Sequence, residues 1–480
     1  MNEAAEITEH INGLKQEFEA EKPKSARDIL DSLLDKMPKI DFVDEAETVE
    51  KLAKKHFVVI VVDKVLEMAK NFDWGLCKRY DFVYLYNGKF WIQIDENDLK
   101  NFLGKAAYRM GVDRFDADYH RFRDELLKQF MAVAHLPEPE AEADTVLINF
   151  DNGTLEINPK AEIKVNLREH SRDDFLTYVL PFEYDPEAEA PKFQKYLDDV
   201  LHERLQKIVS EFIGYVFVGN STLKLEKALI LYGTGANGKS VLYEIVNALL
   251  GPDNVSSYTL QSLTDKNGYY RAKIADKLVN YASEINGNLE ASLFKQLVSV
   301  EPVEARLPYG NPFTITDYAK LIFNCNELPH DVEHTDAFFR RFMIVPFEIT
   351  IPEELQDKEL ASKIINNELS GVFNWVLNGL KRLLNQKRFT ESDAIKKAVD
   401  LYRKEANSVA MFFHENEYQK SVDDYKKLTP LYREYKEFCT MDGYHPVSKR
   451  KFSKRAEAAG YETGRKSSGK VVYVESEIQF

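Results

Sequence analysis

One stretch constrains this 480-residue chain more than any other: a short apolar strand that runs into a glycine-rich loop and then a helix. The strand pattern covers 228–232, the loop has the spacing G-x-x-x-x-G-K-S, and an amphipathic helical pattern follows over 241–250. Glycines let backbone N–H groups turn toward a phosphate, and the N-terminus of the next helix adds a favourable dipole. The sequence therefore predicts a nucleoside-triphosphate site. Its loop residues are Gly233, Thr234, Gly235, Ala236, Asn237, Gly238, Lys239 and Ser240.

Two side chains of the loop carry its specific chemistry. The ammonium of Lys239 can reach the β- and γ-phosphate oxygens, and the hydroxyl of Ser240 can ligate Mg²⁺. A glycine-rich turn can also be ordinary loop chemistry, but the strand before it and the helix after it favour a nucleotide site. We therefore expect ATP and Mg²⁺ as cofactors.

Composition narrows the class of protein. Apolar residues make up 44% and charged residues 30%, which is typical of a soluble globular protein, and the length favours about three domains. No apolar run approaches the roughly 20 residues that span a bilayer, and the acidic first residues do not resemble a signal peptide. We expect a cytoplasmic protein without a membrane partner.

Cysteine usage and net charge exclude further classes. The three cysteines lie far apart without a C-x-x-C pair, which argues against a disulfide framework or a zinc site. The net charge of −15 argues against a protein that coats DNA with its whole surface. Any nucleic acid must therefore bind at a local basic patch or pore.

Upstream of the loop, the pattern changes from helical to mixed. Residues 1–75 are predicted to form a small helical region, which lacks the paired acids of a primase site. Two β-hairpins are predicted, one across Asn87-Gly88 and one across 151–153, with helices over 96–135 between them. Prolines then mark a boundary near residue 190.

Downstream of the loop, polar residues flank three apolar strand patterns. Glu284 ends the first pattern and is placed to polarise the attacking water and to help hold Mg²⁺, unless it is a surface glutamate. Asn326 ends the second and can bind the γ-phosphate or orient the water, although an Asn in this context also forms turns. Arg340 and Arg341 precede the third. They can supply a guanidinium to the phosphoryl group, in cis or from a neighbouring subunit, or form a solvated or salt-bridged face.

In this order the motifs resemble the superfamily-three helicases, a hexameric AAA+ branch found in viruses, phages and plasmids. More closely, they resemble the helicase half of the phage and plasmid primase-helicases related to the poxvirus primase-helicase. Segments 149–153 and 180–186 look like the domain that precedes the helicase in that family. The resemblance covers about 80–350 and, more loosely, the C-terminus.

The resemblance implies a role for each motif. It assigns Lys239 and Ser240 to the Walker A motif, Glu284 to Walker B, Asn326 to sensor 1, and either Arg340 or Arg341 to an arginine finger. Which arginine crosses the interface stays open. ATP would bind between the subunits of a homo-oligomer, expected to be a hexamer.

This chain departs from the family pattern at two positions. The family usually places Gly-Asp where this chain has Val300-Glu301, which leaves the backbone conformation there open. Many Walker B motifs of superfamily three end in two acids, whereas here Ser283 precedes Glu284. Metal binding would then depend more on Ser240 and on the phosphates.

The family also has a DNA-contacting segment between Walker B and sensor 1, which ends in a hairpin that points into the central channel. Here 303–307 and 312–316 can form the arms of that hairpin across a turn signature. Lys295 and Arg306 offer phosphate contacts, and Tyr309 offers a stacking face near the tip.

The C-terminal region follows helices predicted over 352–405 and is the cationic part of an acidic protein. A helix over 431–439, a basic helix over 448–456, and a hairpin that pairs 461–463 with 471–474 follow the winged-helix order. Duplex or fork DNA is the expected ligand, and a protein-docking winged helix or a soluble basic tail are the alternatives. The basic residues concerned are Lys449, Arg450, Lys451, Lys454, Arg455, Arg465 and Lys466.

Together these patterns predict an α/β fold: an AAA+ P-loop ATPase core with a mainly helical N-terminal domain and a C-terminal winged helix. The predicted domains are a helical region 1–75, a pre-helicase α+β domain 76–195, the ATPase core 196–350, a helical bundle 351–410 and a winged-helix-like basic domain 411–480.

The expected function is that of an ATP-dependent replicative DNA helicase of a phage or mobile element, acting on single-stranded and forked DNA. It would work in a bacterial host or phage-infected cell, with a primase or other replication proteins as possible partners. One alternative is a DNA-stimulated ATPase that loads or remodels replication proteins. Another is a protein whose ATP-driven assembly serves origin or partner binding.

Overall fold

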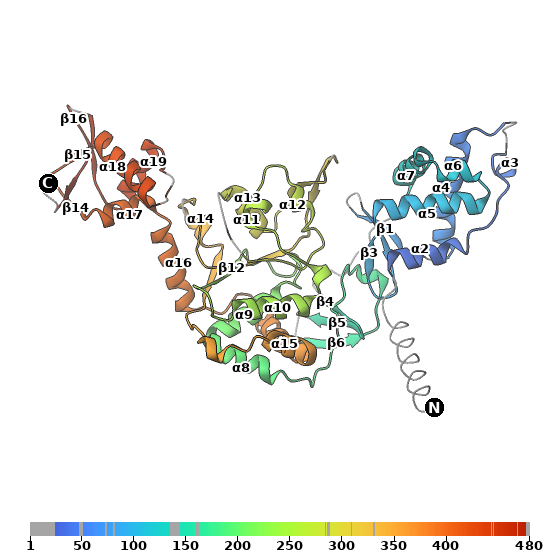
Figure 1. The fold of residues 1–480 in the computed structure, drawn as a ribbon, viewed down its shortest axis with the longest axis horizontal. Helices are drawn as coiled ribbons and strands as arrows, with labels where there is room; N and C mark the ends of the chain where they lie inside the picture. Colours follow the sequence, from blue (N-terminus) through green and yellow to red (C-terminus); the bar gives the residue numbers. More distant parts are fainter. Residues whose placement is uncertain are drawn as a thin grey trace. The chain divides into compact units, whose positions relative to one another are not determined.

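The computed structural model divides into two compact units, Met1–Tyr184 and Asp185–Phe480 (Figure 1). The division falls before the boundary predicted at residue 195. The residues that the structure describes are 25–47, 51–72, 74–79, 82–134, 145–159, 163–283, 285, 289–308, 310–329, 332–442, 444, 446–467 and 469–476.

The helices of the first unit share one hydrophobic core. Leu33 and Val62, which precede residue 75, pack in the same core as Leu103 and Leu126, which follow it. The domain boundary predicted at residue 75 therefore lies inside a single packed region. The helices are α2 (Ala26–Leu34), α3 (Phe42–Glu45), α4 (Lys54–Asn71), α5 (Glu96–Met110), α6 (Arg114–Asp118) and α7 (His120–Val133).

Two antiparallel sheets complete the first unit, and both predicted hairpins are confirmed. The first hairpin pairs Tyr86 with Trp91, and the second pairs Phe150 with Gly153. Each sheet gains a third strand that the sequence did not predict, β1 in one and β6 in the other. The elements are β1 (Leu76–Arg79), β2 (Phe82–Tyr86), β3 (Trp91–Gln93), β4 (Val146–Phe150), β5 (Gly153–Asn158), β6 (Lys164–Arg168) and the 3₁₀ turn η1 (Arg172–Asp174).

The two upstream segments that carried the family resemblance meet in the structure. The side chain of Asn152 donates from Nδ2 to the carbonyl oxygen of Tyr184 and accepts at Oδ1 from its N–H, each at 3.0 Å. The Phe150 ring packs on that of Tyr184, with centroids 5.3 Å apart. Segment 149–153 and the part of 180–186 up to Tyr184 therefore form one folded motif.

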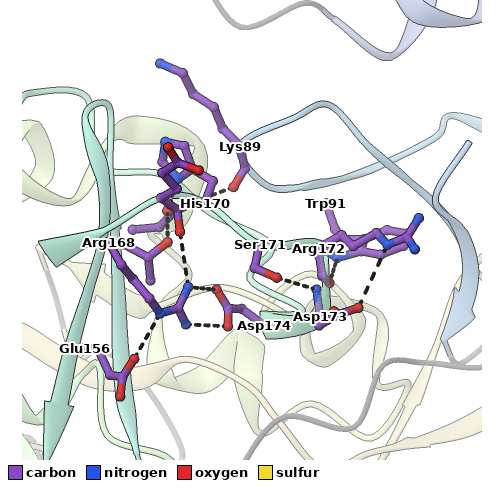
Figure 2. Close-up of polar contacts among 12 residues, drawn as sticks. Lys89, Trp91, Glu156, Arg168, His170, Ser171, Arg172, Asp173 and Asp174 are labelled. Atoms are coloured by element: carbon purple, nitrogen blue, oxygen red, sulfur yellow. Dashed lines mark hydrogen bonds and ion pairs between the residues drawn. The ribbon is translucent and has the colours of Figure 1, made fainter. Parts of the chain in front are cut away.

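A polar network holds the second sheet to the turn that follows it (Figure 2). Arg168 donates to both carboxylate oxygens of Asp174, at 2.9 and 2.6 Å, and its Nε donates to Glu156 at 2.9 Å. A bidentate arginine–carboxylate pair fixes both distance and orientation. Nearby, Trp91 Nε1 donates to the carbonyl oxygen of Arg172 at 2.8 Å, which ties the first sheet to the same turn.

The second unit is built on a five-stranded parallel sheet with the order β13-β7-β12-β9-β8. Its central strands β7 and β12 are buried on both faces and mostly apolar, although β12 includes Lys320 and Asn324. The predicted α/β core with a parallel sheet is therefore confirmed. The strands are β7 (Ala228–Tyr232), β8 (Val255–Ser256), β9 (Val279–Ala282), β12 (Lys320–Cys325) and β13 (Phe342–Pro346).

Four long helices lie together beside this sheet: α8 (Pro191–Val200), α9 (Glu203–Tyr215), α10 (Lys239–Leu250) and α15 (Leu360–Gln386), with α15 in contact with the other three (Figure 1). A Cβ atom at Gly379 would lie 2.4 Å from the carbonyl carbon of Ser210, so α9 and α15 can approach this closely only with glycine there. The fully buried carboxylate of Glu211 on α9 accepts from Arg382 Nε and from the Thr390 hydroxyl, each at 2.6 Å.

The other elements of this region are short apart from α16, which packs against β13. They are η2 (Pro252–Asn254), α11 (Leu260–Leu263), α12 (Tyr269–Ala272), α13 (Ala291–Val298), β10 (Val303–Arg306), β11 (Pro312–Ile315), α14 (Asp336–Phe339), η3 (Glu353–Leu355) and α16 (Asp393–Glu405).

The C-terminal region has its own hydrophobic core, in which Phe412, Tyr435 and Phe452 pack together. Both predicted helices are confirmed, and the predicted hairpin forms, with Thr463 paired to Val472. Its turn is shorter than expected, because Lys466 pairs with Gly469, so the basic residues continue the strand. The elements are α17 (Ser408–Glu415), β14 (Tyr418–Lys420), β15 (Lys426–Lys427), α18 (Leu428–Met441), α19 (Lys449–Ala458), β16 (Thr463–Lys466), β17 (Gly469–Val472) and β18 (Val474–Ser476).

Among the described residues, no helix combines the length and the apolar character needed to cross a membrane.

A buried lysine begins β12. The Lys320 side chain donates from Nζ to Asn220 Oδ1 at 3.0 Å and lies over the Tyr215 ring, 4.6 Å from its centroid. Lys320 is only 7% exposed, and burial lowers the pKa of its ammonium to about 8. A charged lysine at this position therefore opposes folding at neutral pH.

Replacing Lys320 with methionine is expected to raise the free energy of unfolding at pH 7 by about 1–3 kcal/mol, because a buried charge is removed. The folded wild type releases its proton near pH 8 and the unfolded chain only near ~10.4, so wild-type stability rises between these pH values. The advantage of the variant should shrink over the same range. Urea unfolding at pH 7 and pH 9.5 measures it, with exposed Lys358→Met as control. A difference in unfolding free energy between Lys320→Met and wild type that is the same at both pH values would contradict the lowered pKa of Lys320.

Candidate active site

The glycine-rich loop (233–240) leaves the carboxyl end of β7, in the middle of the parallel sheet, and leads into α10 at Lys239. Its backbone enters the left-handed region at Gly235 (φ 117°), Ala236 (φ 49°) and Gly238 (φ 86°). A Cβ atom at Gly238 would lie 2.9 Å from Val200 Cγ1, whereas no atom lies within 4 Å of one at Gly235. The loop is therefore packed on one side and open on the other, as a phosphate cradle requires.

Lys239 turns its ammonium into the loop. Its Nζ donates to the carbonyl oxygen of Gly233 at 2.6 Å and to Asn237 Oδ1 at 3.0 Å. The residue is buried, and this desolvation lowers the pKa of Lys239. A buried ammonium needs acceptors, and the loop itself provides two of them.

Asn237 has a second role that the sequence did not reveal. Its Nδ2 donates to the carbonyl oxygen of Phe347 at 3.2 Å, just beyond the end of β13. The carbonyl oxygen of Ala236 accepts from Ile351 N–H at 2.7 Å. The chain that follows β13 therefore holds the loop in place.

Ser240 is the second residue of α10, and its side chain is exposed at the start of that helix. Glu284, the predicted acid at the end of β9, lies outside the described residues. Among the residues described, no group of three or more His, Cys, Asp or Glu side chains is placed to hold a metal ion. The open side of the loop, the helix start and the Ser240 hydroxyl together fit a magnesium–nucleotide, in which the phosphates would complete the metal's ligands.

Asn326 lies beside the loop at the same edge of the sheet. It directly follows β12, whose last residue Cys325 pairs with Tyr232 of β7 and accepts from Gly233 N–H at 3.1 Å. The Asn326 side chain is exposed there. The structure thus brings Asn326 next to the loop.

A buried pair below this edge escaped the sequence analysis. Tyr281 of β9 donates its hydroxyl to Asn324 Oδ1 of β12 at 3.0 Å, and Asn324 Nδ2 lies 3.5 Å from the carbonyl oxygen of Lys239. Both side chains are buried. A polar residue inside an otherwise apolar strand needs a buried partner, and this was the available signal.

The two adjacent arginines lie at the opposite edge of the sheet from the loop. The carbonyl oxygen of Arg341 accepts from Ala228 N–H at 2.8 Å, and Ala228 is the first residue of β7. A five-residue strand separates the edges by about 15 Å. This distance excludes an action of either arginine on the loop of its own chain.

The structure also distinguishes the two arginines by exposure. The Arg341 side chain is 9% exposed and donates to Ser299 Oγ at 2.9 Å and to the carbonyl oxygen of Ala337. The Arg340 side chain is 64% exposed, with Glu226 3.7 Å away. The Arg340 guanidinium is therefore open to solvent, whereas Arg341 is engaged within the chain.

The hairpin predicted before Asn326 is confirmed, since β10 and β11 pair antiparallel from Val303 with Ile315 to Arg306 with Pro312. Arg306 is exposed near the turn, where its Nε donates to the carbonyl oxygen of Gly310 at 2.8 Å. Tyr309 lies outside the described residues. Lys295 on α13 is engaged elsewhere, because both carboxylate oxygens of Glu333 lie 3.0 Å from its Nζ.

The basic residues of the C-terminal region fall into two groups. Lys449 and Arg455 are half-buried and donate to the Thr429 hydroxyl and to the carbonyl oxygen of Val332 respectively. Lys466 is exposed but lies over two aromatic rings, those of Tyr425 and Tyr473. The side chains exposed to solvent are Arg450, Lys451, Lys454, Arg465 and Lys466.

Val300 adopts the left-handed conformation that glycine favours, with φ 46°. Val300 N–H donates to Leu297 O at 3.1 Å and Glu301 N–H donates to Gln296 O at 3.2 Å, which is the Schellman ending of α13. This settles the backbone at the position where the family usually has glycine. The valine side chain is 9% exposed, so its burial offsets a strain of about 1–2 kcal/mol.

Three family models match successive segments of this chain. "D5 N terminal like" matches residues 63–202, "Family of unknown function (DUF5906)" matches 231–341, and "Poxvirus D5 protein-like" matches 404–479. The second match contains the glycine-rich loop, Asn326 and both adjacent arginines.

Viral proteins are similar over longer stretches. "Putative helicase L207/L206" of Acanthamoeba polyphaga mimivirus is 25% identical over 239 residues, which cover 47% of this chain and 24% of that protein. "Putative helicase 121R" of Invertebrate iridescent virus 3 is 22% identical over 422 residues, covering 78% of this chain and 39% of that protein. The chain thus spans well under half the length of these relatives. Among solved structures, the apo C-terminal region of NrS-1 matches with 12% identity and a TM-score of 0.45, over 87% of this chain and 99% of that one.

Substitutions at Val300 test the strained ending of α13. Both Val300→Gly and Val300→Ala remove the buried side chain, but only glycine relieves the left-handed backbone. We expect Val300→Gly to be more stable than Val300→Ala by about 1 kcal/mol, the reverse of their order inside a helix. Urea unfolding of the two variants measures this difference. An alanine variant as stable as the glycine variant would show that the position is unstrained.

Proposed function

Because this chain belongs to the phage and viral primase-helicase family related to poxvirus D5, we propose that it is an ATP-dependent replicative DNA helicase of a phage or mobile element. One observation carries the proposal. The loop 233–240 and Asn326 share the carboxyl edge of one parallel sheet, while the exposed Arg340 lies at the opposite edge. Such a site is complete only when a second subunit brings its arginine to the nucleotide.

Within one subunit, the loop would hold ATP and Mg²⁺. Lys239 would exchange its present acceptors, Gly233 O and Asn237 Oδ1, for β- and γ-phosphate oxygens, which bind an ammonium more strongly. Ser240 would ligate the metal, and Glu284 would orient the attacking water and support the metal through its water shell. Asn326 would hold the γ-phosphate or that water. The bound Mg²⁺ would supply neutralisation of the phosphate charge.

Between subunits, we assign the arginine finger to Arg340. The exposure of its guanidinium and its distance from the loop of its own chain both favour action in trans, and the engaged Arg341 would support α14 instead. A head-to-tail contact closes into a ring when the rotation between subunits is a simple fraction of a turn, and a hexameric AAA+ ring is the form we propose. We propose to merge the predicted regions 1–75 and 76–195, because helices on both sides of residue 75 share one core, and to keep 196–350, 351–410 and 411–480 as domain limits.

For DNA, we propose two contact regions. The β10–β11 hairpin would follow a single strand through the ring channel, with Arg306 on phosphates and Tyr309 as a stacking face. The C-terminal region, whose helices and β15-β17-β16 sheet support a winged helix, would contact the fork through its exposed cations. Lys295, paired with Glu333, and Lys449 and Arg455, engaged within the protein, are weaker candidates for phosphate contacts.

Strand displacement on a forked duplex tests the proposed activity. Wild type should separate the strands with ATP, and Lys239→Ala should lose more than about 100-fold in ATP hydrolysis and in displacement, because the phosphates lose their ammonium. Arg306→Ala should keep its ATPase and lose roughly five- to tenfold in displacement, with exposed Lys358→Ala as control. A wild type that hydrolyses ATP without separating strands would favour the loading or remodelling ATPase. Full displacement by Arg306→Ala would exclude the hairpin assignment.

Mixing two inactive variants tests the shared site. Arg340→Ala lacks the arginine and Lys239→Ala lacks the lysine, so each should hydrolyse ATP poorly when alone. If neighbouring subunits complete each site, an equal mixture should recover roughly a quarter of the wild-type rate, because about one interface in four pairs intact groups. Arg388→Ala, an arginine 73% exposed at another surface, should remain active alone. A mixture as inactive as its components, although assembled, would contradict action in trans.

A further inference from the structure

Three separate elements of the second unit contact the segment between Asn326 and Arg340. We call residues 332–339 the relay segment, and we infer that it couples DNA binding by the C-terminal region to ATP hydrolysis, with Arg455 as the residue that joins them. The inference rests on the proposed function. The inference goes beyond that function because it assigns Arg455 a role inside the protein in place of the predicted contact with DNA.

The first contact comes from the basic helix α19. Arg455 Nη2 donates to the carbonyl oxygen of Val332 at 3.2 Å, and the residue is half-buried. On the same helix, Arg450, Lys451 and Lys454 are exposed to solvent. One helix therefore presents cations to the solvent and, through a single arginine, holds the backbone of the relay segment.

The second set of contacts comes from α16 and the residue that follows it. Tyr402 is 2% exposed; its hydroxyl donates to Pro329 O at 3.0 Å, and its ring centroid lies 5.5 Å from that of Phe339. Arg403 pairs with Asp336 at 3.0 Å. His334 Nε2 lies 2.9 Å from the carbonyl oxygen of Ala406. Side chains of α16 thus contact Asp336 and Phe339 in the relay segment and Pro329 just before it, and the residue that follows α16 contacts His334.

The connection between α16 and the C-terminal region is too short to absorb motion. α16 ends at Glu405 and α17 begins at Ser408, so two residues separate them. The carbonyl oxygen that faces His334 belongs to the first of these two, Ala406. A displacement of the C-terminal region therefore reaches α16 directly.

The third contact comes from α13, the helix that precedes the β10–β11 hairpin. Lys295 binds both carboxylate oxygens of Glu333, and Glu333 also accepts from the Thr335 hydroxyl at 2.6 Å. Hydrogen bonds from Thr335 and Lys295 lower the pKa of Glu333, so its carboxylate is charged at neutral pH. The relay segment is thereby tied to α13, the helix directly before the hairpin that we propose to follow the DNA strand.

The far end of the relay segment carries the proposed finger. Thr335 caps the one-turn helix α14, and Arg340 N–H donates to Asp336 O at 3.0 Å, so Arg340 moves with that turn. On the other side of the segment, α16 also contacts Pro329, three residues after Asn326, through the Tyr402 hydroxyl. A shift of α19 on binding DNA can therefore change Asn326 in one site and Arg340 in the next.

Two neighbouring residues of α19 provide the test. Arg455→Gln removes the contact with Val332, and Lys454→Gln removes the same charge from the exposed face. The ATPase rate of the full chain is measured with and without saturating forked duplex, and the DNA affinity by fluorescence anisotropy. We expect Arg455→Gln to lose at least fivefold of the DNA-stimulated rate with basal rate and DNA Kd within twofold of wild type. Lys454→Gln should weaken DNA binding several-fold and keep full stimulation at saturation.

The conservative change Arg455→Lys keeps a donor and a charge and should restore part of the stimulation. If Arg455→Gln is stimulated like wild type, or if it weakens DNA binding as Lys454→Gln does while keeping full stimulation, the inference is wrong. A wild-type ATPase that DNA does not stimulate would overturn it too.

Hydrogen exchange separates this inference from the proposed function, because it needs no hydrolysis. Adding forked duplex should change the hydrogen-exchange protection of residues 332–342 in wild type. In Arg455→Gln saturated with DNA, this protection should stay unchanged. A protein that binds ATP and DNA without unwinding could still show this difference, in which case the helicase proposal fails and the coupling stands. Equal protection with and without DNA in wild type would overturn the coupling.

Discussion

The rest of the structure depends on the parallel pairing of β7 with β12 on one side and β13 on the other. This pairing alone brings the end of β12 beside the loop that follows β7 and places the start of β13 at the opposite edge. Parallel neighbours require crossover connections, so the chain must leave the sheet after each strand and return to its amino edge. The relay segment, between β12 and β13, is such a crossover.

The crossover has a consequence for the chemistry. It begins at the edge that holds the nucleotide loop and ends at the edge that carries Arg340. In the function that we propose, this segment would therefore belong to two sites, through Asn326 to the nucleotide of its own subunit and through Arg340 to that of the neighbouring subunit. Three elements, α13, α16 and α19, contact this segment, so a movement of any of them would reach both ends of the crossover.

Local patterns in the sequence predicted the elements of this site. Five apolar residues followed by G-x-x-x-x-G-K-S predicted β7, the loop and α10, and a turn signature predicted the β10–β11 hairpin. Such features depend on residues a few positions apart. The positive φ of Val300 could not be predicted from its residue type, because a valine gives no signal for a left-handed backbone.

Contacts between distant segments were beyond the reach of these patterns. Tyr281 and Asn324 meet only because β9 and β12 are neighbours in the sheet, and Tyr402 meets Pro329 only because α16 returns to that crossover. The same limit explains the basic helix, where charge alone suggested that every cation faces DNA. Packing of α19 against the core turns Arg455 inward and leaves the exposed cations to the solvent.

The position of Lys239 shows how the loop is prepared for an anion. Its ammonium is buried, and an isolated charge in that environment would be costly. Asn237 reduces the cost: its amide nitrogen donates to Phe347 O, which orients its amide oxygen toward the lysine. The loop thus keeps a desolvated positive charge satisfied by two neutral acceptors. Charged phosphate oxygens attract an ammonium more strongly than neutral ones, so their arrival would favour release of the lysine from both without unfolding the loop.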